Sequence, residues 1–398
     1  MSKTDDFIAE VEKVSAHNYH PIPVVISQAQ GIWVTDVEGK RYLDMLSAYS
    51  ALNQGHRHPK ILAALKEQVD RLTLTSRAFH NDRMGAFLKK LTGLAGYDKA
   101  LPMNTGAEAV ETAIKAARKW GYKRKGVAKD KAKIIVCEEN FHGRTTTIVG
   151  FSTDPICRTE FGPFTPGFEI IPYNDAKALE RAIDDNTVAF MVEPIQGEAG
   201  INVPDEGYLG CCREITKERN VLLICDEIQT GLGRTGKLFC SDWEEVRPDI
   251  ICLGKALGGG VYPVSAIVAD DDIMMTAFEP GNHGSTFGGN PLGCIVASAA
   301  LDVIIDERLP QRSAELGQYF MGELKKIAHP RIKEVRGKGL MIGVELGEPA
   351  RPYSEQLMKR GILAKETHVT TIRLAPPLII KKEELDGALK TITEVLGS

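Results

Sequence analysis

The sequence lacks the features that mark membrane, secreted and nucleic-acid-binding proteins. Its longest apolar run, residues 294–305, is interrupted by Ser298 and Asp302, and it is shorter than the roughly 20 residues that span a bilayer. The first residues do not form the basic and then apolar pattern of a secretory signal. A net charge of −4 gives no reason to expect a nucleic acid or an anionic membrane as a partner.

Cysteine usage indicates core packing rather than redox chemistry. None of the eight cysteines belongs to a C-x-x-C pair, and Cys137, Cys225 and Cys252 lie in apolar runs typical of buried strands. The vicinal pair at 211–212 is interpreted as packing as well. We therefore expect a reduced, cytoplasmic protein.

What the sequence does contain is a long alternation of helical and strand-like segments. Its 398 residues, 43% hydrophobic and 26% charged, suffice for two or more domains with a large core. The alternation predicts an α/β fold with a mostly parallel sheet covered on both sides. The predicted helices are 5–15, 60–74, 82–94, 106–124, 176–185, 207–219, 310–327 and 382–396. The predicted strands are 31–46 with a turn inside it, 133–137, 168–172, 187–192, 221–225, 249–253, 264–268, 332–336, 339–346 and 371–374.

The pattern changes after residue 306, where strands and helices indicate a smaller α+β domain. The sequence therefore predicts a large domain at 58–306 and a C-terminal small domain at 307–398. An N-terminal segment, 1–57, is expected to join the small domain.

Two apolar runs end abruptly at a side chain that can ionise, the first at Asp226 and the second at Lys255. Each run reads as a strand buried on both faces of a parallel sheet, and ligands of such sheets bind beyond the carboxyl ends of the strands. A lysine there can form a Schiff base with a carbonyl cofactor, while the acid keeps the ring nitrogen of the cofactor protonated. The alternative is a structural ion pair at the edge of the sheet.

Other polar segments follow predicted strands or open predicted helices. Gly106 lies at a helix start that suits an anion, although an ordinary N-cap with a capping box explains the same residues. Phe141 could stack on a planar cofactor and Arg144 could clamp a carboxylate, or they could be a core aromatic and a solvated cation. His142, between them, is interpreted as structural. The H-x-H pattern at 56–58 has no further ligands, so no metal site is predicted.

Taken together, these segments resemble the class III aminotransferases, the pyridoxal-phosphate enzymes that act on ω-amino groups. The resemblance covers nearly the whole chain and keeps the order and spacing of the family motifs. The matching segments are N-T-G-A-E-A at 104–109, F-H-G-R-T at 141–145, E-P-I-Q-G-E at 193–198, D-E-I-Q-T-G-L-G-R-T-G at 226–236, G-K at 254–255 and G-S-T-F-G-G-N-P at 284–291.

The resemblance implies a fold type I enzyme that uses pyridoxal 5'-phosphate (PLP). It implies that Lys255 bonds to the cofactor and later carries a proton, while Asp226 pairs with the nitrogen of the ring. Its other implied contacts are the N–H groups of Gly106 and Ala107 at the phosphate, Phe141 and Ile228 on the ring faces, Gln229 at the phenolic oxygen, and Ser285 and Thr286 at the phosphate of a neighbouring subunit. This last pair implies a homodimer with shared active sites.

Within the family, two segments resemble the branch that uses ornithine: A-H-N-Y-H-P at 16–21 and S-A-Y-S-A-L-N-Q-G-H at 47–56. That branch moves the δ-amino group of ornithine to 2-oxoglutarate, which yields glutamate. By resemblance, Tyr19 and Arg144 hold the α-amino acid end of ornithine, and Tyr49 shapes the pocket. Arg373 binds the α-carboxylate of glutamate or 2-oxoglutarate, and Glu198 neutralises it when ornithine is bound.

Three rival functions use similar machinery. Acetylornithine or 4-aminobutyrate aminotransferases share the core motifs, but the Tyr19 and Tyr49 segments argue against them. A lyase or racemase of the same fold needs no switchable carboxylate site, which is what Arg373 with Glu198 would form. A PLP-binding regulator would need a DNA-binding module or a basic patch, and the sequence shows neither.

Overall fold

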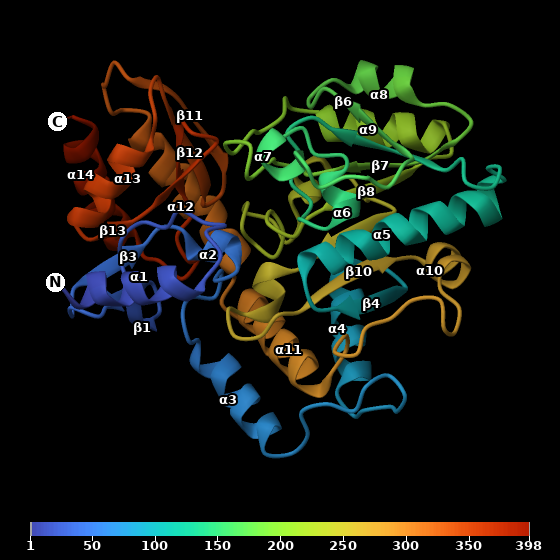
Figure 1. Ribbon diagram of the computed structural model, residues 1–398, viewed down its shortest axis with the longest axis horizontal. Coiled ribbons are helices and arrows are strands. Elements are labelled where there is room, and N and C mark those ends of the chain that lie inside the picture. The colour runs from blue at the N-terminus through green and yellow to red at the C-terminus, as the bar shows by residue number, and fades with distance from the viewer. Residues whose placement is uncertain (1, 398) are drawn as a thin grey trace.

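The structure is a computed structural model that describes residues 2–397. A central sheet with helices on both faces occupies one side of the molecule, and two smaller sheets with their own helices occupy the other (Figure 1). The predicted α/β class with a large sheet and a smaller α+β part is confirmed. The central sheet has the order β4 (Lys99–Met103), β10 (Ser265–Ala269), β9 (Ile250–Leu253), β8 (Leu222–Asp226), β7 (Thr187–Val192), β5 (Lys133–Cys137) and β6 (Phe168–Ile171).

The five strands from β9 to β6 are parallel, and β10 runs antiparallel to both of its neighbours. Helices explain why these strands read as continuous apolar runs. Leu222 and Ile224 of β8 face the core beneath α5 (Gly106–Trp120), whereas Leu223 and Cys225 face the core beneath α9 (Tyr208–Glu218). Because successive side chains of a strand alternate between faces, both sets must be apolar.

The N-terminal and C-terminal segments of the chain lie on the same side of the molecule and share a sheet (Figure 1). One small sheet has the order β1 (Ile26–Gln30), β2 (Trp33–Asp36), β3 (Arg41–Asp44) and β13 (Ile362–Leu363), in which β3 and β13 are parallel. The other has the order β11 (Ile332–Lys338), β12 (Met341–Leu346), β15 (Thr371–Leu374) and β14 (Lys365–Thr367). One hydrophobic core runs from β9 to β12, so the two sides of the molecule are packed together.

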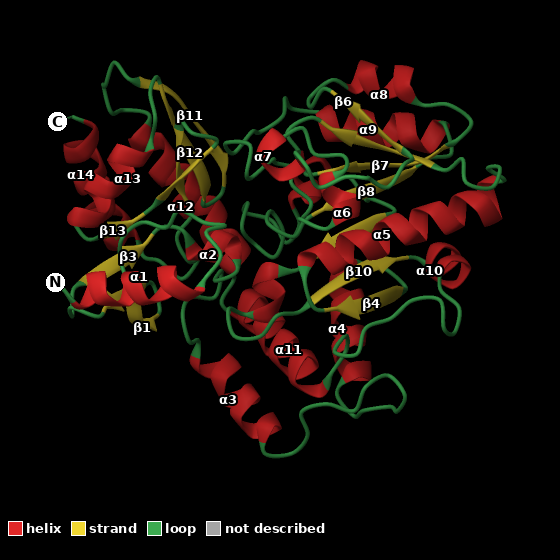
Figure 2. Ribbon diagram, in the orientation of Figure 1, coloured by secondary structure: helices red, strands yellow, loops and turns green. Residues whose placement is uncertain are grey.

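Helices connect and cover these sheets (Figure 2). No helix within residues 2–397 is long and apolar enough to cross a membrane. The remaining α-helices are α1 (Lys3–Val14), α2 (Ser47–Ser50), α3 (Pro59–Val69), α4 (Met84–Ala95), α6 (Thr146–Val149), α7 (Pro155–Arg158), α8 (Ala176–Ala182), α10 (Asp271–Ala277), α11 (Pro291–Asp306), α12 (Leu309–Leu324), α13 (Arg351–Lys359) and α14 (Lys382–Leu396). Short π or 3₁₀ turns are η1 (Gly121–Lys125), η2 (Cys240–Glu244) and η3 (Lys255–Gly258).

Some predicted bounds were wrong. The helix predicted at 60–74 ends at Val69, and the helix predicted at 106–124 ends at Trp120, where a π turn follows. The strand β4 was missed because Pro102 lies inside it, and proline argues against a central strand. β4 is an edge strand, so within the described chain it pairs only with β10, and an edge strand can accommodate proline.

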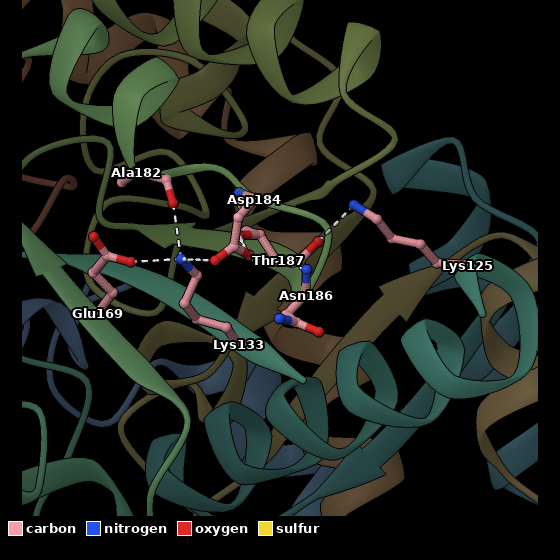
Figure 3. Close-up of polar contacts among 7 residues, drawn as sticks. All are labelled: Lys125, Lys133, Glu169, Ala182, Asp184, Asn186 and Thr187. Carbon is pink, nitrogen blue, oxygen red and sulfur yellow. Dashed lines mark hydrogen bonds and ion pairs between the residues drawn. The ribbon is translucent and has the colours of Figure 1, made fainter. Parts of the chain in front are cut away.

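The amino edge of the central sheet carries a charged cluster whose members satisfy one another (Figure 3). The Lys133 ammonium lies 2.6 Å from Glu169 and 2.9 Å from Asp184, and it donates to the Ala182 carbonyl at 2.8 Å. Both carboxylates are about half exposed, so such pairs stabilise the fold by no more than about 1 kcal/mol each. This edge is structural, and the carboxyl edge is different.

Candidate active site

The carboxyl edge of the parallel strands gathers the ionisable side chains that the sequence placed there. Asp226 ends β8, Glu193 directly follows β7, and Lys255 follows β9 after one glycine. The segment after β5 closes the site, because the Phe141 N–H donates to the Glu193 carboxylate at 2.8 Å. Burial raises the pKa of Glu193 to about 7, against the lowering effect of the neighbouring His142.

Lys255 has the properties of a reactive amine rather than a structural cation. Within residues 2–397 its ammonium makes no hydrogen bond or ion pair, and its backbone has a φ of 44°, which is rare for a residue with a side chain. Such strain clusters at functional sites. Burial lowers the pKa of Lys255 below its usual value, although the negative charges of Glu198 and Asp226 act in the opposite direction. More of the amine is therefore neutral near pH 7 than for a free lysine.

Asp226 is buried and held in place from two sides. Its Oδ2 accepts a hydrogen bond from His142 Nδ1 at 2.7 Å, and its Oδ1 accepts from the Ile228 N–H at 3.1 Å. Burial alone would lower the pKa of His142, but the bond to Asp226 and its negative charge raise it. The sequence indicates a structural role for His142 but does not reveal this contact. The sequence signal for this contact is the position of His142, directly after Phe141 and beyond the carboxyl end of a parallel strand.

Glu227 lies next to Asp226 in the sequence, yet its carboxylate does not belong to the site. Its carboxylate accepts from the Thr230 hydroxyl at 2.5 Å and from the backbone N–H groups of Cys240 and Ser241 at 2.9 and 2.8 Å. These three donors occupy the carboxylate and hold the loop after β8. Glu227 is therefore a structural acid.

The start of α5 presents backbone N–H groups to the same edge. The capping box is present, with Thr105 Oγ1 accepting from the Glu108 N–H at 3.2 Å and Glu108 accepting in return at 2.8 Å. The N–H groups of Gly106 and Ala107 make no hydrogen bond within the described chain. A methyl group at Gly106 would come within 3.2 Å of Ile228, so a side chain there would crowd the space above the helix start.

These features fit PLP. The chain offers a lysine without a partner, a buried carboxylate with spare lone pairs, two unbonded N–H groups at a helix start, and two partly exposed apolar side chains, Phe141 and Ile228. The lysine suits the aldehyde of PLP, and the carboxylate suits its protonated ring nitrogen. The N–H groups suit its phosphate, and the apolar side chains suit the faces of its planar ring. Within residues 2–397, no three His, Cys, Asp or Glu side chains are grouped as a metal ion would require.

A second charge pair lies beside the lysine. Arg373 Nη1 contacts Glu198 Oε1 at 2.7 Å, and Arg373 is only 2% exposed. The same carboxylate oxygen accepts from Gln229 Nε2 at 3.2 Å, and the guanidinium lies 5.1 Å from the centre of the Tyr49 ring. Burial would raise the pKa of Glu198, but the charge of Arg373 and its hydrogen bond lower it to about 2. We call this Glu198–Arg373 ion pair the charge switch.

The remaining predicted residues lie farther out. Tyr19 is 69% exposed and lines, with Tyr49, a cavity of about 300 Å³. The exposed Arg144 guanidinium lies 5.5 Å from the centre of the Phe141 ring. Ser285 accepts a hydrogen bond from Asn104 at 2.8 Å, and Thr286 is exposed. The structure therefore brings Tyr49 to the charge switch and leaves Tyr19, Arg144 and Thr286 on the surface.

Comparison with known proteins agrees with the class of enzyme that this fold and site define. The family model for class III aminotransferases matches residues 14–396. The chain is 63% identical over 396 residues to an ornithine aminotransferase of Brevibacillus brevis, covering 100% of this chain and 99% of that protein. It is 62% identical to an ornithine aminotransferase of a Geobacillus species, with 100% of both chains covered.

Solved structures give the same picture. The ornithine aminotransferase of Toxoplasma gondii superposes with a TM-score of 0.97 at 48% identity, covering 100% of this chain and 95% of that one. The acetylornithine aminotransferase of Elizabethkingia anophelis superposes with a TM-score of 0.91 at 50% identity, covering 100% and 99%. A second Toxoplasma gondii structure reveals partial occupancy of PLP at its active site.

The chain belongs to the class III aminotransferase family, and it is a PLP-dependent transaminase. The predicted family, fold and cofactor are confirmed. The roles of the individual site residues remain predictions.

Proposed function

We propose that this protein transfers the δ-amino group of L-ornithine to 2-oxoglutarate. The products are glutamate, and glutamate 5-semialdehyde that cyclises to pyrroline-5-carboxylate. The charge switch carries the proposal, because a buried arginine with a removable partner suits an enzyme whose two substrates differ in where their carboxylates lie. The full-length relatives that are 60–63% identical and are named ornithine aminotransferases support it.

The carboxyl edge would hold PLP by its functional groups. Gly106 and Ala107 would donate their N–H groups to the phosphate, Asp226 would accept the ring N–H, and Lys255 would bond to the aldehyde carbon. Bound PLP supplies an electron-accepting ring that stabilises negative charge on the carbon that bears the amine. The contact between His142 and Asp226 keeps the Asp226 carboxylate turned toward this edge.

Three further side chains would complete the cofactor site. Gln229 would donate to the phenolic oxygen of PLP, and Phe141 and Ile228 would lie on either face of the ring. Gly197 makes room for Gln229, because a methyl group at Gly197 would come within 2.0 Å of the Gln229 side-chain oxygen.

Lys255 would also carry the proton of the reaction. A general base works best when its pKa lies near the working pH, and burial lowers the pKa of Lys255 toward that range. Once the substrate amine has replaced Lys255 on the cofactor, the free Lys255 amine would hold the proton that leaves the amine-bearing carbon of the substrate. The strained backbone at Lys255 fixes the start of this side chain at the end of β9.

The charge switch would decide which amine reacts. With Glu198 bound to Arg373, no free cation awaits an α-carboxylate near Lys255, so ornithine enters with its δ-amine first. Tyr19 and Arg144 would then hold the α-amino acid end of ornithine, and Tyr49 would shape the pocket. When glutamate or 2-oxoglutarate enters, Glu198 moves aside and Arg373 binds the α-carboxylate.

The proposal includes an assembly and a location. Ser285 and the exposed Thr286 would reach the phosphate of a neighbouring subunit, which makes the protein a homodimer with shared active sites. Residues 1–57 and 307–398 would form the small domain and 58–306 the large one, as the pairing of β3 with β13 supports. We place the enzyme in the cytoplasm, where it would serve either arginine breakdown or proline supply.

The test is turnover by the purified protein. Ornithine and 2-oxoglutarate together should yield pyrroline-5-carboxylate, trapped with 2-aminobenzaldehyde, and either substrate alone should yield no sustained product. N-Acetylornithine is the second candidate, because an acetylornithine aminotransferase is 50% identical over the whole chain. Preferential turnover of N-acetylornithine or 4-aminobutyrate would replace the proposal, and loss of ornithine without an acceptor would indicate a lyase or racemase.

A further inference from the structure

The loop that carries Glu198 is held at its backbone by side chains from the small sheet that contains Arg373. The Thr367 hydroxyl, at the end of β14, donates to the Glu198 carbonyl at 2.6 Å. Arg336, on β11, donates to the Gly200 carbonyl at 2.7 Å and to the Ile201 carbonyl at 3.0 Å. Both donors lie more than 130 residues from the loop in the sequence.

Every nitrogen of the Arg336 guanidinium has a hydrogen-bond partner. Its Nη1 pairs with Glu334 at 2.8 Å and also with Glu345, which leaves Nε and Nη2 for the loop. Gly200 has a φ of 110°, and a methyl group there would come within 3.1 Å of Arg336 Nη2. A side chain at position 200 would therefore be strained by this φ and would also crowd the guanidinium.

The Thr367 contact is equally specific. Thr367 is only 5% exposed, and its hydroxyl bonds the carbonyl of the same residue whose carboxylate contacts Arg373. Arg373 lies on β15, next to β14 in the same sheet. One sheet thus supplies the cation of the charge switch and fixes the backbone of its anion.

We propose that Thr367 and Arg336 are positioning residues that set amine selectivity by holding Glu198 against Arg373. This inference rests on the proposed function of the charge switch. A loosened loop would leave Arg373 unpaired more often, so it would favour binding in which the α-carboxylate of the substrate contacts Arg373 and the α-amine reacts, as glutamate requires. The glutamate half-reaction would gain relative to the ornithine half-reaction.

The test measures single-turnover rate constants with ornithine and with glutamate on the PLP-loaded protein. Thr367→Val removes one buried hydrogen bond, and the ornithine-to-glutamate ratio should fall about five-fold. Thr367→Ser keeps the hydroxyl and should restore the ratio. Thr370→Val is the matched control, because the Thr370 hydroxyl makes only a 3.5 Å contact with the nearby His368 carbonyl. Its ratio should equal that of the native protein.

Arg336→Gln should shift the ratio in the same direction. A double-mutant cycle then separates selectivity from general destabilisation. In a Glu198→Ala background, Thr367→Val should change the ratio no further, because no carboxylate remains to be positioned.

An unchanged ratio in Thr367→Val, or an equal change in the Glu198→Ala background, overturns the inference. Failure of the proposed function is a different result, since the native protein would then lack an ornithine half-reaction. In that case the inference is tested by the glutamate half-reaction alone. The glutamate concentration that gives half the maximal rate should fall in Thr367→Val, and an unchanged value overturns it.

Discussion

Replacing Glu198 by glutamine should shift the preference between the two substrates of this enzyme from ornithine toward glutamate. The change keeps the size of the side chain and removes the charge that Arg373 contacts at 2.7 Å. Arg373 is 2% exposed, so it would remain as a buried cation that only a substrate carboxylate can neutralise. Ornithine could then bind through its own α-carboxylate and present the wrong amine.

The size of the effect follows from the ion pair. The Glu198 pKa of about 2, against an ordinary 4.5, corresponds to roughly 3 kcal/mol of interaction with its surroundings. Because the Glu198 side chain is 30% exposed, solvent screens part of this, and we take about 1–2 kcal/mol as the usable part. The ornithine-to-glutamate ratio should therefore fall by about 5- to 30-fold.

The assay follows the absorbance of the bound cofactor in single-turnover mixing with each amino acid. Glu206→Gln is the control, because Glu206 is an exposed glutamate downstream in the chain with no contact to the charge switch. A ratio that stays unchanged in Glu198→Gln would show that Glu198 is only a structural acid.

The same interaction predicts a pH effect on stability. Because the pKa of Glu198 is lowered in the folded protein, its contribution to stability is present above about pH 4.5 and is lost as the pH falls toward 2.

Three further variants test other parts of the site and fold. Lys255→Ala should abolish turnover and the visible absorbance of the bound cofactor; a borohydride-reducible adduct at another lysine would contradict the assignment. Asp226→Asn should keep PLP bound but slow each half-reaction by orders of magnitude, and an unchanged single-turnover rate would remove Asp226 from its role. Arg234→Met should destabilise the fold by about 3–5 kcal/mol, because the fully buried guanidinium bonds Asn53 and the Leu340 and Pro376 carbonyls. Urea unfolding checks this last value, and an unchanged midpoint would refute it.

Much of the fold could be predicted because its strands are buried on both faces. The runs that end at Asp226 and Lys255 are apolar at every position for this reason, and the parallel arrangement places both ends at one edge. The edge strand β4 was not predicted, because it contains Pro102 and because its first residues are exposed or partly exposed and do not form an apolar run.

The site could be predicted less completely, because sequence does not show where neighbouring side chains turn. Asp226 and Glu227 are adjacent acids, yet the first bonds His142 at the carboxyl edge while the second binds the loop after β8. The contact of His142 with Asp226 spans 84 residues, and that of Thr367 with Glu198 spans 169. Such pairs depend on how strands from distant parts of the chain meet, which no local pattern encodes.

The most direct test of the central claim follows the nitrogen atom itself. Ornithine labelled with nitrogen-15 at the δ-position only is incubated with the purified protein and 2-oxoglutarate, and the glutamate formed is analysed by mass spectrometry. If the charge switch directs the δ-amine to the site, the glutamate carries the label and the other product is pyrroline-5-carboxylate. Unlabelled glutamate accompanied by pyrroline-2-carboxylate would show that the α-amine reacts, and it would contradict the account.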